Sequence, residues 1–123
     1  MKLTVNFECL DGYYKIDINN NTYSIETNIN YLNSTSGVLD NDNYNSYKEM
    51  FNKTNICLWQ PKYETNGLSI EDSVKWNVTY IDDNDTTYSS SGEEGFWPYE
   101  FDTLIHALMY FDSNIKCFIS NNN

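Results

Sequence analysis

Three segments near the beginning of the chain alternate apolar and polar residues, which is the pattern of strands with one buried face. The first runs from Leu3 to Cys9, the second from Tyr14 to Ile18, and the third begins at Tyr23. An Asp-Gly pair and a run of three asparagines separate them, and both are typical of tight turns. These segments predict an antiparallel meander. Over 28–40 the alternation of apolar and polar residues is weaker.

The clearest alternation comes in the second half of the chain, over 74–80. Three aspartates and an asparagine at 82–85 predict a hairpin turn, and the return strand is expected over 86–90. A short apolar run at 56–59 suggests an edge strand that ends before a proline. The last alternating segment, 115–119, predicts a final strand that completes the sheet.

Two segments have the periodicity of helices. The first covers 44–52, with Asp42 or Asn43 as its N-cap. The second covers 99–111 and is expected to begin at Pro98, because proline suits the first turn of a helix. The polar face of this second helix carries Asp102, His106 and Tyr110, and its apolar face carries Phe101, Leu104, Ile105, Leu108 and Phe111.

Together these elements predict the α+β class. We expect an antiparallel sheet of about five to six strands, with one major C-terminal helix packed on it and one short helix. The length of the chain and the absence of a linker indicate a single domain over 1–120. The asparagines at 121–123 are interpreted as a disordered tail.

The charge of the chain is unusual. It contains no arginine, and its seven lysines face eighteen carboxylates, so the formal net charge is −11 over 123 residues. Aromatic residues make up 16% of the sequence, which is more than a disordered acidic segment carries. The sequence therefore indicates a folded domain with an acidic surface, and such a surface attracts positively charged partners.

This charge argues against two classes of partner. Direct nucleic-acid binding requires lysine and arginine at the phosphates, and anionic membrane surfaces likewise attract basic segments. No apolar run approaches the roughly 20 residues that cross a bilayer. The first residues alternate in polarity and lack the apolar core of a signal peptide, so we expect a cytoplasmic protein with no membrane partner.

The three cysteines, Cys9, Cys57 and Cys117, are far apart, and each lies in an apolar stretch. A secreted scaffold stabilised by disulfides usually has an even number of cysteines in a denser pattern. We therefore expect buried free thiols, with a disulfide between two of the three as the alternative.

The acidic residues concentrate in one segment. Between Glu71 and Asp112, ten carboxylates face the single lysine Lys75, so this segment carries −9 of the total charge of −11. The turn at 82–85 and the loop at 93–94 are expected at opposite ends of the return strand, roughly 20 Å apart at about 3.4 Å per residue. That spacing fits an extended acidic stripe such as a DNA backbone presents.

Aromatic residues beside the acidic loop extend this candidate surface, because aromatic residues next to charges are typical of interface hot spots. Two alternatives stay open: Trp97 can belong to the core or to a hydrophobic staple before the helix, and the carboxylates can serve solubility alone. The candidate partner-binding residues are Glu71, Asp72, Asp82, Asp83, Asp85, Glu93, Glu94, Trp97, Tyr99 and Glu100.

The sequence offers little for catalysis. His106 is the only histidine, and with Asp102 four residues earlier it is interpreted as a surface pair worth a few tenths of a kcal/mol. One histidine and three scattered cysteines cannot form a zinc site of ordinary spacing. Asp40-x-Asp42 and Asp83-x-Asp85 begin like calcium loops, but neither combines the required glycine at position 6 with glutamate at position 12. We expect no enzyme, no metal and no cofactor.

At the level of class, the chain resembles the small acidic inhibitors encoded by phages and mobile elements of low-GC Gram-positive bacteria. These include anti-CRISPR proteins and the immunity proteins that neutralise nuclease toxins. The resemblance rests on size, on segment 71–112 with its charge of −9, and on the absence of arginine. It implies a stoichiometric inhibitor that occupies the basic nucleic-acid-binding surface of a nuclease or CRISPR effector by mimicry. The alternative is a non-mimetic interaction module of a phage or Gram-positive bacterium that binds through aromatic residues.

A second similarity, to small domains of the same bacteria, concerns the fold alone. It is carried by Trp76-Asn77-Val78-Thr79-Tyr80, Ser91-Gly92 and Pro98. In those domains a strand of this kind, a turn and a Ser-Gly loop precede a helix that begins with proline. The similarity implies an arrangement of elements and adds nothing about function.

Overall fold

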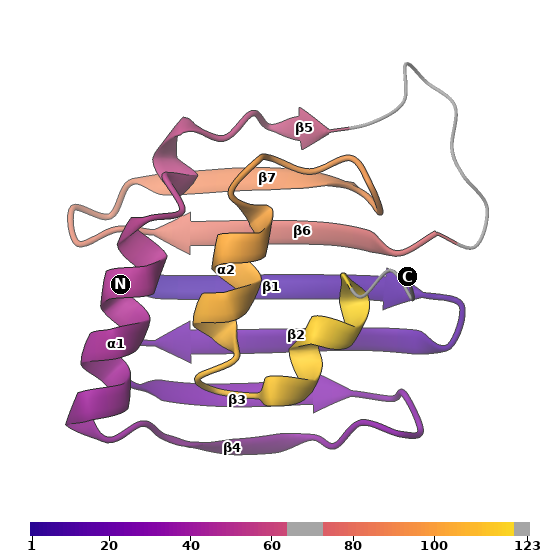
Figure 1. Cartoon of the computed structure of the whole chain (residues 1–123), viewed down its shortest axis with the longest axis horizontal. Helices are drawn as coiled ribbons and strands as arrows, with labels where there is room; N and C mark the ends of the chain where they lie inside the picture. Colours follow the sequence, from indigo (N-terminus) through magenta and orange to yellow (C-terminus); the bar gives the residue numbers. More distant parts are fainter. Residues whose placement is uncertain (64–72, 120–123) are drawn as a thin grey trace.

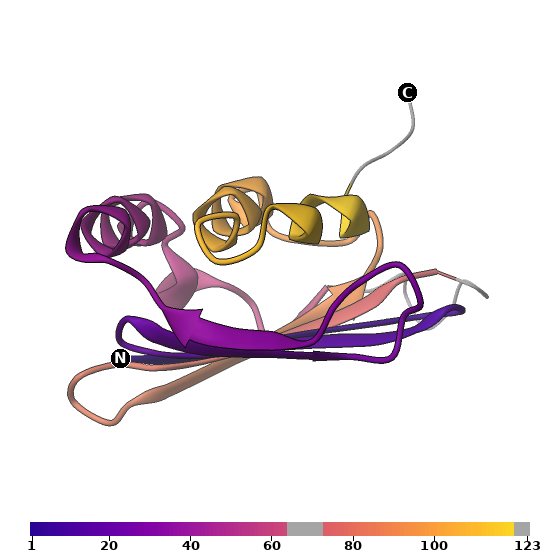
Figure 2. The ribbon, with the colours of Figure 1, turned by 90° about the horizontal axis from the view of Figure 1, so that it is seen from below.

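The computed structural model describes residues 1–63 and 73–119, and these form two layers. A mixed sheet makes one layer, and the helices lie together on one of its faces (Figures 1 and 2). The elements in chain order are β1 (Lys2–Cys9), β2 (Gly12–Asn19), β3 (Thr22–Thr27), β4 (Thr35–Val38), α1 (Asn41–Asn52), the 3-10 helix η1 (Ile56–Leu58), β5 (Lys62–Tyr63), β6 (Lys75–Ile81), β7 (Thr87–Glu93), α2 (Phe101–Leu108) and the 3-10 helix η2 (Ser113–Phe118).

The seven described strands are ordered β4-β3-β2-β1-β6-β7-β5. Strands β1, β2 and β3 form the predicted meander, and β4, in the segment 28–40 where no strand was predicted, extends it. The β6–β7 hairpin adds to the free side of β1, with Val5 opposite Val78. The α+β class is therefore confirmed. Two details of the prediction were wrong. The described part of the chain contains seven strands instead of the predicted five to six, and the sheet is mixed instead of antiparallel because β5 runs parallel to β7.

The core lies between the sheet and the helices. Alternate residues of the central strands point into it, and Phe7 of β1 stacks on Phe118 of η2 with ring centroids 4.4 Å apart. Helix α2 buries its predicted apolar face, with Ala107 in addition. Phe111, just past the end of α2, packs edge-on against Tyr47 of α1 at 4.8 Å. The two helices thus share one core with the sheet.

Two predicted strands are 3-10 helices instead. Residues 115–119 belong largely to η2, in which Ile115 and Phe118 are buried three residues apart, as the tighter helix requires. Asp112 begins η2 by accepting a hydrogen bond from the Asn114 N–H at 3.0 Å. The expected edge strand at 56–59 contains η1, after which the Trp59 indole donates to the Thr54 carbonyl at 2.8 Å.

The helix boundaries also differ from the prediction. Helix α1 begins at Asn41, because Asp40, rather than Asp42 or Asn43, is its N-cap and accepts from the Asn43 N–H at 2.8 Å. Helix α2 is shorter than 99–111, and its N-cap is Glu100. Pro98 lies in the preceding turn, where its carbonyl accepts from the Phe101 N–H at 3.0 Å.

All three cysteines are free thiols, as predicted, but the expected burial was wrong for two of them. Cys57 and Cys117 are exposed, whereas Cys9 is partly buried at the end of β1. Both exposed residues lie in the 3-10 helices, where the neighbouring apolar residues Ile56 and Phe118 take the inward positions.

The hydroxyl of Tyr47 is buried and has no hydrogen-bond partner among the described residues. An unsatisfied buried hydroxyl costs about 1–3 kcal/mol, so we expect Tyr47→Phe to raise the free energy of unfolding by about 1 kcal/mol. Urea unfolding measures this change. Tyr14→Phe is the matched control, because the Tyr14 hydroxyl donates to Asp112 Oδ2 at 2.9 Å and its loss should destabilise. Equal destabilisation by both substitutions would contradict the prediction.

Candidate partner-binding surface

The turn between β6 and β7 carries three of the candidate carboxylates, and each has a different surrounding. Asp82 is partly buried, and its Oδ1 accepts from the Asn84 and Thr86 N–H groups at 2.9 and 3.0 Å, so it holds the turn together. Asp83 is exposed and pairs with the N-terminal ammonium at 3.1 Å. Asp85 is exposed and has a φ of +62°. Asp83 and Asp85 are therefore the two that a partner can reach.

Glu93 and Glu94 lie at the other end of β7, as predicted. The register pairs Lys75 with Glu93 at one end of the hairpin and Ile81 with Thr87 at the other. Glu94 Oε1 accepts from the Val74 N–H at 3.2 Å, which ties the loop to the start of β6. The structure therefore keeps the two acidic groups of the hairpin apart.

The remaining candidates lie before and within α2. Trp97 is partly buried and stacks on Phe101 at 5.0 Å with nearly parallel rings, so it belongs to the edge of the core. Tyr99 is 98% exposed. Glu100 occupies the N-cap position of α2 without a side-chain capping hydrogen bond, and Asp102 is exposed in the first turn, where a negative charge suits the helix dipole. Glu71 and Asp72 lie outside the described residues.

The helices leave one face of the sheet uncovered (Figure 2). The side chains of this face are polar and balanced in charge. On β1 and β2 the residues of this face alternate with the buried ones, and Asp17 contacts both Lys15, at 3.5 Å, and Thr4, at 2.7 Å. The charged residues of this face are Lys2, Glu8, Lys15, Asp17, Glu26, Lys62, Lys75 and Glu93. The acidic excess of the chain therefore lies elsewhere.

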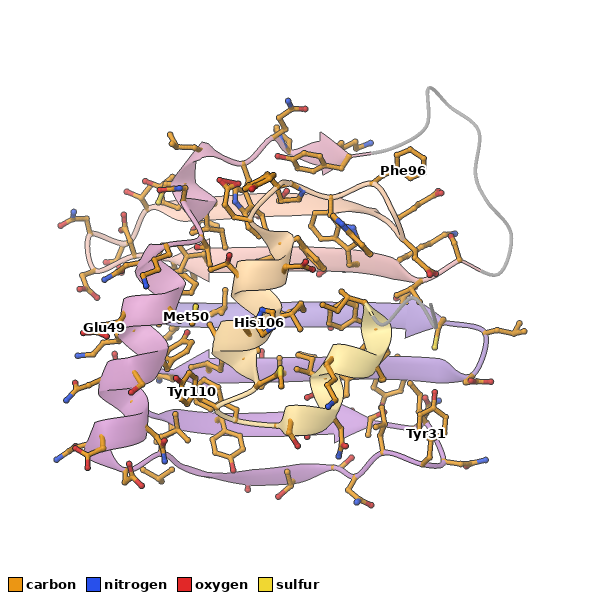
Figure 3. All side chains as sticks on the ribbon, viewed as in Figure 1. Tyr31, Glu49, Met50, Phe96, His106 and Tyr110 are labelled. Atoms are coloured by element: carbon orange, nitrogen blue, oxygen red, sulfur yellow. The ribbon has the colours of Figure 1, made fainter. Side chains whose placement is uncertain are left out.

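A groove between α1 and α2, which the sequence did not indicate, lies on the outer side of the helix layer. It has a volume of about 260 Å³ and is lined by Met50, His106, Met109 and Tyr110. Figure 3 shows Met50 on the side of α1 that faces α2, with His106 and Tyr110 across from it. The apolar residues come from two helices far apart in sequence, so local periodicity contains no signal for the groove.

His106 does not form the predicted side-chain pair with Asp102. Its Nδ1 lies 2.8 Å from the main-chain carbonyl oxygen of Asp102. Since a carbonyl oxygen only accepts, Nδ1 carries the proton and donates, which leaves Nε2 of the neutral ring as an acceptor. The ring is exposed and held at the edge of the groove.

Among residues 1–63 and 73–119, no three histidine, cysteine or acidic side chains lie close enough to hold a metal ion. In the same part of the chain, no helix is both long and apolar enough to cross a membrane.

The fold and these surfaces define a two-layer α+β protein with helices on one face of the sheet and exposed carboxylates around the hairpin and α2. No protein-family model matches the chain, and no curated protein matches it.

Proposed function

We propose that the protein is a stoichiometric inhibitor that binds the basic nucleic-acid-binding surface of a nuclease or CRISPR effector. One observation carries the proposal: Asp85, Glu100 and Asp102 form no ion pair with any described residue, whereas the uncovered sheet face is balanced by lysines. In a chain of net charge −11, the helix side and the hairpin turn thus offer unpaired carboxylates. Such groups suit arginine and lysine on a partner.

In this mechanism the carboxylates bind the basic side chains that otherwise hold phosphates. Asp83 and Asp85 act from the turn, Glu100 and Asp102 act from α2, and the exposed ring of Tyr99 packs beside them. Asp82 and Trp97 contribute indirectly, because the first fixes the turn and the second packs on Phe101. Charge attraction raises the association rate, and added salt lowers this rate because it screens the attraction.

The test of this function is capture of bacterial nucleases, including CRISPR effectors with and without guide RNA, on the immobilised protein across a salt series. We expect one basic nuclease to be retained at low salt, released at high salt and displaced by DNA. Capture that DNA does not displace, or no capture at any salt, would overturn mimicry.

Neutral variants of the carboxylates locate the contact. Asp83→Asn with Asp85→Asn, and Glu100→Gln with Asp102→Asn, each raise the net charge by two, and asparagine tolerates the positive φ at position 85. We expect each pair to slow association with the captured nuclease about tenfold at low salt. Asp82 is left intact because it holds the turn.

Glu8→Gln with Glu26→Gln is the matched control. It changes the net charge equally but on the uncovered sheet face, so its association rate should stay within about twofold of the original. Biolayer interferometry measures all three rates. If the control slows association as much as the other pairs, only total charge matters and the proposed contact is wrong.

A second candidate function is a non-mimetic interaction module. The groove between α1 and α2 and the exposed Tyr99 favour it, because both present apolar surface to solvent. Binding through these groups would resist salt, and DNA would not compete with it. The same salt series therefore separates the two functions.

A further inference from the structure

We propose that the groove between α1 and α2 binds an amphipathic α helix of a basic protein, with an apolar side chain of that helix inserted between Met50 and Met109. The inference deepens the proposed function and rests on it, since it names the segment of the basic partner that is held. The carboxylates around the hairpin would then attract the partner, and the groove would position it.

The size of the groove fits a side chain rather than a free small molecule. Its volume of about 260 Å³ lies below the roughly 300–1,000 Å³ of ligand pockets, and it is open to solvent along the two helices. Methionine side chains are flexible and polarizable, and they adapt to apolar groups of different shape. Two methionines that line one groove are therefore suited to a partner's leucine, phenylalanine or methionine.

Two buried rings join the elements on either side of the groove. Tyr47 of α1 and Phe111, just past the end of α2, pack edge to face at 4.8 Å. Because these rings hold the two elements together, a partner that contacts the flexible methionine side chains need not unfold the helices. A helix laid in a groove between helices is a recurrent mode of peptide recognition.

Charges beside the groove favour a basic occupant. Asp102 lies on α2 one turn before His106, and Glu49 precedes Met50 but lies on the side of α1 away from α2 (Figure 3). Both are exposed and form no ion pair within the described part of the chain. Lys48 on α1 lies over the Tyr44 ring at 4.5 Å. A basic amphipathic helix would place its apolar residues in the groove and its lysines toward these acids.

His106 adds an acceptor to the groove. Its Nδ1 is engaged by the Asp102 carbonyl, so Nε2 can accept a hydrogen bond from a lysine or arginine of the occupant. A second copy of this chain is a poor occupant, because each copy carries a net charge of −11 and the acids beside both grooves would repel.

The probe for this proposal is a fluorescein-labelled synthetic peptide of 18 leucines and lysines, ordered so that its leucines form one helical face. Its control peptide has the same composition, but its order creates no apolar face. Fluorescence anisotropy at about 150 mM salt, a concentration that screens exposed charges beyond roughly 8 Å, should show at least tenfold tighter binding of the amphipathic peptide. Equal affinity of the two peptides would overturn the proposal, because charge alone would then explain binding.

Variants of the protein locate the binding of the amphipathic peptide. Met50→Ala with Met109→Ala should weaken it about tenfold, the loss expected when interface anchors are truncated. Leu10→Ala with Leu58→Ala is the matched control, since both leucines are exposed, at 78% and 82%, and lie outside the groove. Glu49→Gln with Asp102→Asn removes two negative charges without changing the core, and it should also weaken the binding of the amphipathic peptide. Equal weakening by the leucine control would overturn the assignment to the groove.

The nuclease experiment separates the failure of this inference from failure of the proposed function. If the methionine variant still captures a nuclease that DNA displaces, while the two peptides bind equally, the inhibitor function stands and the groove proposal falls. If no nuclease is captured but the amphipathic peptide binds through the methionines, mimicry falls and groove binding stands without it.

Discussion

Replacing Trp76 by alanine is expected to lower the free energy of unfolding by about 3–5 kcal/mol. The indole is only 2% exposed, and it lies at the centre of an aromatic cluster with Phe101 at 4.8 Å and Tyr63 at 5.9 Å. Its Nε1 also donates to the Phe96 carbonyl at 3.3 Å, which fixes the loop before α2. Alanine would leave a cavity between sheet and helix and an unpaired carbonyl.

Urea unfolding followed by circular dichroism measures this loss. Trp97→Ala is the matched control, because Trp97 is only partly buried and stacks on a single ring, that of Phe101. We expect it to cost about 1–2 kcal/mol, in proportion to the smaller area that it buries. If the two substitutions cost the same, the central place of Trp76 in the core would be wrong.

Raising the pH above 10 should destabilise the fold steeply. Burial raises the pKa of the Tyr14 and Tyr47 hydroxyls well above the ordinary value of 10, and for Tyr14 the nearby Asp112 carboxylate raises it further. The folded state thus keeps these protons while the unfolded state loses them. The contribution of these two tyrosines to the free energy of unfolding is fully present below pH 10. It is lost as the pH rises, by about 1.4 kcal/mol per pH unit for each tyrosine.

Urea unfolding at pH 9, 10, 11 and 11.5 tests this dependence. Once the unfolded tyrosines are ionised, Tyr14 and Tyr47 together contribute about 2.7 kcal/mol per pH unit to the slope, and other tyrosines with a raised pKa, such as Tyr44 and Tyr80, add to it. Tyr47→Phe should therefore reduce the slope by about 1.4 kcal/mol per pH unit. A slope that Tyr47→Phe leaves unchanged would show that the buried hydroxyl of Tyr47 is not responsible.

Long alternating segments allowed much of the sheet to be predicted. The first three strands and the β6–β7 hairpin agree with their apolar patterns, and their turns contain the expected glycine and asparagine residues. The short elements were not predicted correctly, because an apolar pattern of only a few residues is compatible with the period of a strand and with that of a helix. Ile115, Cys117 and Ile119 alternate like a strand, yet the pair that reaches the core is Ile115 and Phe118. The two-residue strand β5 depends on a parallel partner distant in sequence.

The candidate surface was predictable only in part. Charge counting located the acidic segment, and turn chemistry placed its two acidic groups at opposite ends of β7. Charge counting could not distinguish Asp82, whose side chain holds the turn by accepting two main-chain N–H groups, from Asp85, whose side chain forms no ion pair with a described residue. The groove was hidden for a different reason: Met50 and Met109 meet only because α1 and α2 pack together on the sheet.

The place of β1 in the sheet affects how the chain folds during synthesis. This strand leaves the ribosome long before β6, which ends at Ile81, yet one of its two edges pairs with β6. At roughly 5–20 residues per second, several seconds pass between the emergence of β2 and that of β6. Throughout that interval the nascent meander has an unpaired edge beside Val5 and Phe7, and such edges promote aggregation. A chaperone that covers this edge during translation would therefore protect the nascent chain until β6 pairs with β1.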